Sequence, residues 1–134
     1  MGDPSERKRT SIYFKYGNAM IKYLVAFISI ALSAIAQYFF KVGVDRIKLS
    51  ESNIVIAALK NCYIIGGLAC YGISVIFWFY VISQMELSKA YPLVSLGYVF
   101  TALLGYFFLN ENINAFRLIG IGLIIAGVIF ISRS

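Results

Sequence analysis

Histidine is absent from the 134-residue sequence, and cysteine and proline occur only twice each. Without histidine the chain lacks the commonest general base and the usual ligands of zinc and haem sites. Cys62 and Cys70 would lie about 12 Å apart along one helix, too far to form a disulfide within it. The sequence therefore predicts no metal site, no cofactor and no enzyme activity, and we interpret the cysteines as buried thiols.

Charge is also scarce, because only 13% of the residues are charged while 60% are hydrophobic. A soluble domain has about a quarter charged residues, so this composition excludes one. The apolar residues fall mainly into four uncharged stretches, and about 20 helical residues are needed to cross a bilayer. The sequence predicts an all-α membrane protein with an SMR/EamA-like bundle of four transmembrane helices. We expect the spans at about 23–42, 62–85, 89–109 and 114–132.

The remaining residues are too few for a separate folded domain. Residues 1–22 are interpreted as a basic tail with a possible short interfacial helix, and residues 23–134 as the transmembrane transporter domain. A cleavable leader ending near Ala34-Ile35-Ala36 is the alternative interpretation of the first apolar run. The loop 43–61 holds the apolar segment 54–59, which is too short to span, and Ser50 or Ser52 could cap a short helix there.

The net charge of +6 does not indicate nucleic-acid binding. Lysine and arginine lie at the ends of the apolar stretches rather than on one face, as expected for contacts with anionic membrane lipids. The positive-inside rule favours a cytoplasmic location for both termini, but the bias is weak and leaves an antiparallel partner open. The two groups are Arg7, Lys8, Arg9, Lys15, Lys22, Lys89 and Arg133 on one side, and Lys41, Arg46, Lys48, Lys60 and Arg117 on the other.

The first span carries a polar stripe at i, i+4 steps: Ser29, Ser33, Gln37 and Lys41. Unpartnered polar groups are costly in lipid, so this stripe should face other helices or a hydrated cavity. The alternative is that the serines permit close packing, Gln37 bonds a neighbouring helix and Lys41 only extends to the interface.

The third span carries a second polar face, formed by Tyr91, Ser95 and Tyr98. We expect Pro92 in the first turn of this helix, where its missing N–H is least harmful. Two polar faces on separate helices predict a shared cavity. Trp78 of the second span could line that cavity or pack in the core.

The fourth span contains small residues at helical spacing: Gly120, Gly122, Ala126 and Gly127. Such residues let transmembrane helices approach closely, so we predict an oligomer interface here. The alternative is that the glycines fill a tight place within one chain.

None of the six carboxylates falls inside a predicted membrane core. Exchange of cations for protons normally uses an intramembrane carboxylate whose pKa burial can raise. Proton-coupled export of cations is therefore disfavoured.

The segment from Ala31 to Lys41, the segment from Ser88 to Gly97 and the spacing from Gly120 to Gly127 together resemble the drug/metabolite transporter superfamily at the size of its small multidrug resistance (SMR) branch. Within it, Gln37 with Lys41 and the run from Ala90 to Leu96 are most similar to the ArnE and ArnF family. This resemblance implies a dimeric flippase for aminoarabinose-phosphoundecaprenol that serves lipopolysaccharide modification. Ser33 stands where drug-exporting members carry a glutamate, which argues against proton-coupled efflux.

We therefore hypothesise a bacterial inner-membrane transporter subunit that flips a lipid-linked sugar phosphate, with a second copy or a paralogous small membrane protein as its partner. The alternatives are an SMR-type exporter of small cations or polyamines and a non-transporting accessory subunit. The predicted substrate-binding residues are Ser33, Gln37, Lys41, Trp78, Lys89, Tyr91, Ser95, Tyr98 and Arg117, with the cations opposite the phosphate.

Overall fold

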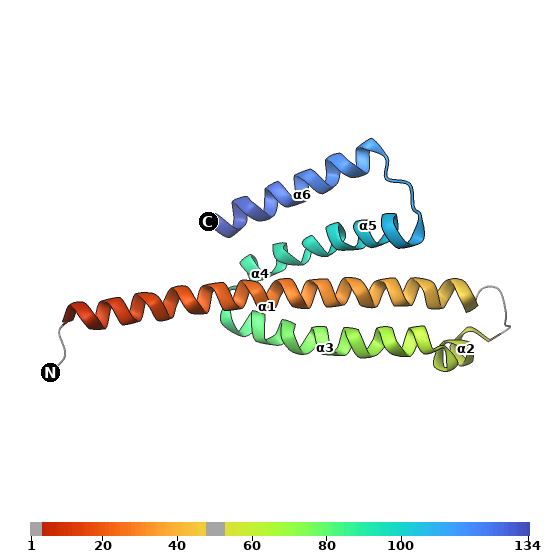
Figure 1. Cartoon of the computed structure of the whole chain (residues 1–134), viewed down its shortest axis with the longest axis horizontal. Helices are drawn as coiled ribbons and strands as arrows, with labels where there is room; N and C mark the ends of the chain where they lie inside the picture. Colours follow the sequence, from red (N-terminus) through yellow and green to blue (C-terminus); the bar gives the residue numbers. More distant parts are fainter. Residues whose placement is uncertain (1–3, 48–52) are drawn as a thin grey trace.

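The computed structural model describes residues 4–47 and 53–134, and every regular element in these ranges is a helix (Figure 1). The elements are α1 (Pro4–Ile47), α2 (Ile54–Lys60), α3 (Cys62–Gln84), α4 (Leu87–Val94), α5 (Leu96–Leu109) and α6 (Ala115–Arg133). Within the described ranges, four segments are long and apolar enough to cross a membrane: Asn18–Ile47, Cys62–Gln84, Leu87–Leu109 and Ala115–Arg133. The predicted four-helix membrane fold is therefore confirmed, with α4 and α5 forming the third segment together.

The first helix is much longer than the sequence suggested. With 44 residues, α1 extends about 66 Å at 1.5 Å per residue, and its N-terminal part projects beyond the other helices (Figure 1). Pro4 occupies the first helical position, where proline is well tolerated, and no later proline interrupts α1. The expected boundary between a tail and the first span near Lys22 thus lies inside one continuous helix, whose apolar segment of membrane-spanning length begins at Asn18.

The connection between α1 and α3 contains the short helix α2, which has no buried residue. Asn53 precedes α2 without capping it through its side chain, while Ser50 and Ser52 lie outside the described residues. Asn61 caps α3 instead: its Oδ1 accepts a hydrogen bond from the Tyr63 N–H at 2.9 Å. The prediction of two buried thiols is wrong, because Cys62 follows directly after Asn61 and is exposed, and Cys70 is only half-buried.

Small residues allow α1 and α3 to pack side by side along most of the length of α3 (Figure 1). Gly67 on α3 is buried, and a Cβ atom there would lie 2.8 Å from the Phe40 ring and 3.2 Å from the Ala36 carbonyl oxygen. The Ser29 hydroxyl donates a 2.8 Å hydrogen bond to the Ser74 carbonyl oxygen between the same helices. Close backbone approach and a buried hydrogen bond therefore hold α1 against α3.

The third membrane segment is interrupted at Ser95, which lies between α4 and α5. Glu86 is extended and its carbonyl accepts the N–H groups of Lys89 and Ala90, so α4 begins at Leu87. Pro92 consequently lies in the second turn rather than the first, where it removes one helical hydrogen bond. The Ser95 N–H bonds the Pro92 carbonyl three residues back, and α5 starts just afterwards. The expectation of a first-turn proline is wrong because the helix starts before the Lys-Ala-Tyr-Pro sequence.

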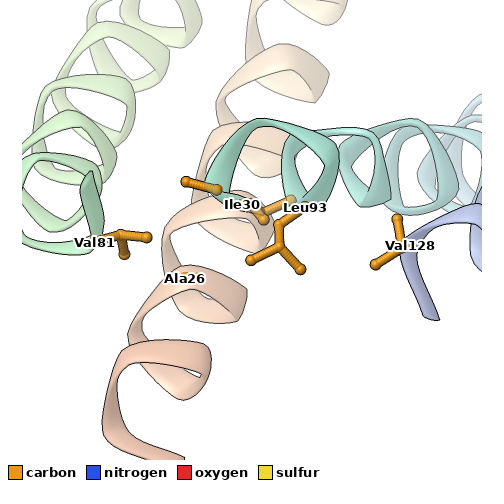
Figure 2. Packing of buried hydrophobic residues seen from close by; sticks show 6 residues of the cluster. Ala26, Ile30, Val81, Leu93 and Val128 are labelled. Carbon is orange, nitrogen blue, oxygen red and sulfur yellow. The ribbon is translucent and has the colours of Figure 1, made fainter. Parts of the chain in front are cut away.

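A small apolar core gathers at the end of the bundle where α4 begins. Figure 2 shows Ala26 and Ile30 of α1 converging with Val81 of α3, Leu93 of α4 and Val128 of α6. Val128 brings α6 into this cluster, and the opposite ends of α5 and α6 are joined by residues 110–114. The geometry leaves room between α1, α5 and α6 on the side away from the core.

Candidate functional site: a cavity between α1, α5 and α6

A cavity of about 490 Å³ lies between α1, α5 and α6, a volume typical of sites for small ligands. Its walls are mostly apolar, with polar groups at a few positions, as in most ligand sites. The lining residues are Ala34, Gln37, Tyr38, Lys41, Tyr98, Thr101, Ala102, Leu104, Gly105, Leu109, Glu111, Arg117, Gly120, Ile121 and Ile124.

Charged side chains gather at one end of the cavity, where α5 ends and α6 begins. Lys41 approaches from α1, and its Nζ lies 3.0 Å from Asp45 Oδ1 one turn later. Arg117 approaches from α6, with its NH1 group 3.8 Å from Glu111 Oε2 and donating to the Asn112 carbonyl oxygen at 3.3 Å. All four charged side chains are about half exposed, so both ion pairs contribute little to stability and can be exchanged for a ligand.

Polar groups without a protein partner face the cavity further from this charged end. Within the described ranges, neither the Gln37 amide nor the Tyr98 hydroxyl makes a hydrogen bond, and both line the cavity. The Thr101 hydroxyl also lines it and donates to the Tyr98 carbonyl oxygen. The unpaired amide and hydroxyl can therefore form hydrogen bonds to a polar ligand.

Four of the predicted substrate-binding residues line this cavity: Gln37, Lys41, Tyr98 and Arg117. The other five lie elsewhere. Trp78 packs against the apolar core, and Lys89 is half-buried near the start of α4. Tyr91 is 63% exposed outside the cavity, and the hydroxyls of Ser33 and Ser95 bond the carbonyl oxygens of Ile30 and Pro92.

The residues of the predicted stripe on α1 face different neighbours, because positions four apart do not lie directly above one another on a helix. A helix turns about 100° per residue, so each i, i+4 step advances the stripe by about 40° and three steps by about 120°. Ser29 accordingly faces α3 and bonds Ser74, whereas Gln37 and Lys41 face the cavity beside α5 and α6. On the third segment, Tyr91 lies in α4 and Tyr98 in α5, about two turns apart, and of the two only Tyr98 lines the cavity.

Glu111 is the charged cavity residue that the sequence did not indicate. It follows α5 and was counted among carboxylates outside the membrane core. Asn110 adopts the left-handed conformation (φ 53°), and the Glu111 N–H then donates to the Gly105 carbonyl oxygen at 3.0 Å. This turn folds the side chain back along the last turns of α5. The signal available in the sequence was Gly105, a glycine four residues before the end of an apolar helix, where a following side chain can approach the backbone.

The predicted oligomer-interface residues occupy two different faces of α6. Gly120 lines the cavity, and Gly127 is half-buried. Gly122 and Ala126 are exposed on the other side of the helix, and nothing lies within 4 Å of a Cβ atom built on Gly122. The pair at 122 and 126 is therefore the part of this set that is open to another protein or to lipid.

The chain matches the model of the EamA-like transporter family over residues 10–133. It is 28% identical to the probable 4-amino-4-deoxy-L-arabinose-phosphoundecaprenol flippase subunit ArnE of Pseudomonas fluorescens, over 82% of this chain and 96% of the relative. It is 33% identical to the probable ArnF subunit of the same flippase in Photorhabdus laumondii, over 83% and 96% of the two chains. The probable ArnF subunit of Shewanella sediminis is 32% identical, over 81% and 85%.

No solved structure gives a significant match to the chain. The family match covers nearly the whole sequence and agrees with the four apolar helices of membrane-spanning length. The chain is therefore an integral, multi-pass membrane protein that belongs to the EamA-like transporter family.

Proposed function

We propose that the chain is a subunit of an inner-membrane flippase that moves a polyisoprenyl-phosphate-linked amino sugar between the two leaflets. The observation that supports this most strongly is the cavity, which combines two cations with unpaired hydrogen-bonding groups between three membrane helices. The substrate class comes from the ArnE and ArnF relatives, which are described as flippase subunits for such a lipid.

The physical task of such a flippase is to carry a polar headgroup through an apolar layer while the lipid tail stays in the bilayer. A polar group buried without a partner costs several kcal/mol, so each hydroxyl of the sugar needs a substitute for water. Gln37 and Tyr98 provide these substitutes inside the cavity, and the neighbouring apolar walls can contact the isoprenoid chain.

The phosphate would bind at the charged end of the cavity. Lys41 and Arg117 come from different helices, so they can contact one phosphate from two sides through charge-assisted hydrogen bonds. Lys89 belongs to α4 at the opposite end of the third segment, where it could contact the phosphate at the other membrane face. Cations near both membrane faces thus suit an anionic headgroup better than a cationic drug.

The termini would lie in the cytoplasm, as the distribution of lysine and arginine favours. The N-terminal part of α1, with Arg7, Lys8 and Arg9 exposed, then extends from the membrane on the cytoplasmic side. The charged end of the cavity, at the start of α6, faces the opposite side in this orientation.

A second small membrane subunit would complete the transporter. The buried share of the membrane segments falls from 28% in the first to 6% in α6, so α6 is the segment least covered by its own chain. The exposed Gly122 and Ala126 allow a partner helix to approach closely. Purification of the full chain in mild detergent should recover a complex with a second copy or a paralogous subunit; a monomer that transports would contradict this.

Leaflet-resolved transport of a labelled lipid-linked amino sugar in proteoliposomes tests the function. Hydrogen bonds to charged groups contribute about 1.5–3 kcal/mol each, so Lys41→Ala should slow flipping on the order of tenfold to a hundredfold. Gln37→Ala should slow it less, because the amide is neutral. Lys60→Ala is the matched control, since Lys60 ends α2 away from the cavity. Flipping that both cavity variants leave unchanged would contradict the site.

A further inference from the structure

The cavity contains a carboxylate that a phosphate ligand does not require. Glu111 lines the cavity together with Lys41 and Arg117, and a carboxylate near a phosphate repels it. The contact between Arg117 NH1 and Glu111 Oε2 is long, at 3.8 Å, and both side chains are about half exposed. Such a pair contributes little to stability, so the ion pair alone does not explain why a carboxylate lies in the cavity.

The fold nevertheless holds this carboxylate in place. The left-handed Asn110 and the hydrogen bond from the Glu111 N–H to the Gly105 carbonyl oxygen fix the turn after α5. Gly105 is buried, and a Cβ atom built on it would lie only 2.8 Å from Glu111 Oε2. The carboxylate therefore rests against bare helix backbone, in space that any larger residue at 105 would fill.

We propose that Glu111 makes the cavity selective for a headgroup that carries an ammonium group as well as a phosphate. This inference rests on the proposed function. Lys41 and Arg117 bind the phosphate, and the Glu111 carboxylate accepts hydrogen bonds from the ammonium group of the sugar. Two cations and one carboxylate line the cavity, while Asp45, which pairs with Lys41, is not among the lining residues. The phosphate and the ammonium group of such a ligand carry the charges opposite to these lining groups.

Selectivity follows because a neutral sugar would leave the Glu111 carboxylate without a charged partner. A sugar with a hydroxyl in place of the ammonium group still satisfies the cations through its phosphate. It offers the carboxylate only a neutral hydrogen bond, in a site from which the ligand excludes water. Charge-assisted hydrogen bonds are about twice as strong as neutral ones, so the amino sugar should bind on the order of tenfold tighter.

The test measures equilibrium binding to the full chain, with any subunit that co-purifies, in lipid nanodiscs. The two probes are short-chain isoprenyl phosphates that carry 4-amino-4-deoxy-arabinose or arabinose. For the unaltered protein we expect the amino form to bind at least tenfold tighter. Glu111→Gln should bring this ratio close to one, chiefly by weakening binding of the amino form.

Two further variants separate recognition from a structural role. Gly105→Ala keeps the charge of Glu111 but displaces its carboxylate, so the ratio should also fall. Glu86→Gln removes an exposed carboxylate that precedes α4 and should leave the ratio unchanged. If Glu111 only stabilised the turn, its replacement would weaken both probes equally and preserve the ratio.

The outcomes distinguish this inference from the proposed function. Equal binding of both probes by the unaltered protein would overturn the inference and leave the flippase proposal standing, and this result does not depend on the folding of any variant. A tenfold ratio that survives Glu111→Gln would overturn it as well. Failure of both probes to bind would overturn the proposed function together with the inference.

Discussion

At the scale of single residues, the charged groups of the cavity follow from the helix ends that carry them. Lys41 and Arg117 were predictable because basic residues beside apolar stretches lie near the membrane surface, where a lipid phosphate is available. Glu111 was not predictable, because its position depends on the left-handed Asn110 and on the absence of a side chain at Gly105. Sequence spacing alone does not show that a residue beyond a helix end folds back along that helix.

The two cysteines offer a prediction at this scale. Cys62 is exposed at the start of α3, whereas Cys70 is half-buried two turns into a membrane segment. If the termini are cytoplasmic, a membrane-impermeant thiol reagent added to the periplasmic side should label Cys62 and not Cys70. Cys62→Ser should abolish the labelling and Cys70→Ser should preserve it. Labelling of Cys62 from the cytoplasmic side alone would reverse the proposed orientation.

At the scale of elements, the sequence indicated where helices lie but not how they face one another. The apolar stretches predicted all four membrane segments, because bilayer thickness sets their length directly. The stripe from Ser29 to Lys41 was harder to interpret, since a rotation of about 120° distributes it over two neighbouring helices. Pro92 was placed one turn too early because the carbonyl of the extended Glu86 starts α4 at Leu87.

Packing between α1 and α3 gives a prediction for these elements. Gly67→Ala would place a methyl group 2.8 Å from the Phe40 ring and 3.2 Å from a backbone oxygen that cannot easily move. We expect a loss of about 1–3 kcal/mol of stability, the usual effect of overpacking, measured by thermal unfolding in detergent. Gly72→Ala is the matched control, because nothing lies within 4 Å of its Cβ position. Equal stability of both variants would contradict the close approach of α1 and α3.

At the scale of the whole molecule, the chain has an apolar core at one end and a charged cavity at the other. Composition and the four apolar stretches sufficed to predict a membrane bundle, and the residues of the first and third spans indicated that a polar cavity exists. They did not indicate that α6 forms its third wall, because α6 contributes Arg117 and small or apolar residues rather than a polar stripe. A site between helices depends on their packing, which a single sequence does not show.

The location of the substrate can be measured by photocrosslinking in proteoliposomes. Tyr91 and Tyr98 form a matched pair on the third segment, because they are 63% and 69% exposed and only Tyr98 lines the cavity. A photoreactive amino acid is placed at either position, and a labelled isoprenyl-phosphate amino sugar is added with and without unlabelled competitor. We expect strong, competable crosslinking from position 98 and only weak, non-competable crosslinking from position 91. Equal crosslinking from the two positions, or stronger crosslinking from position 91, would contradict the cavity as the binding site.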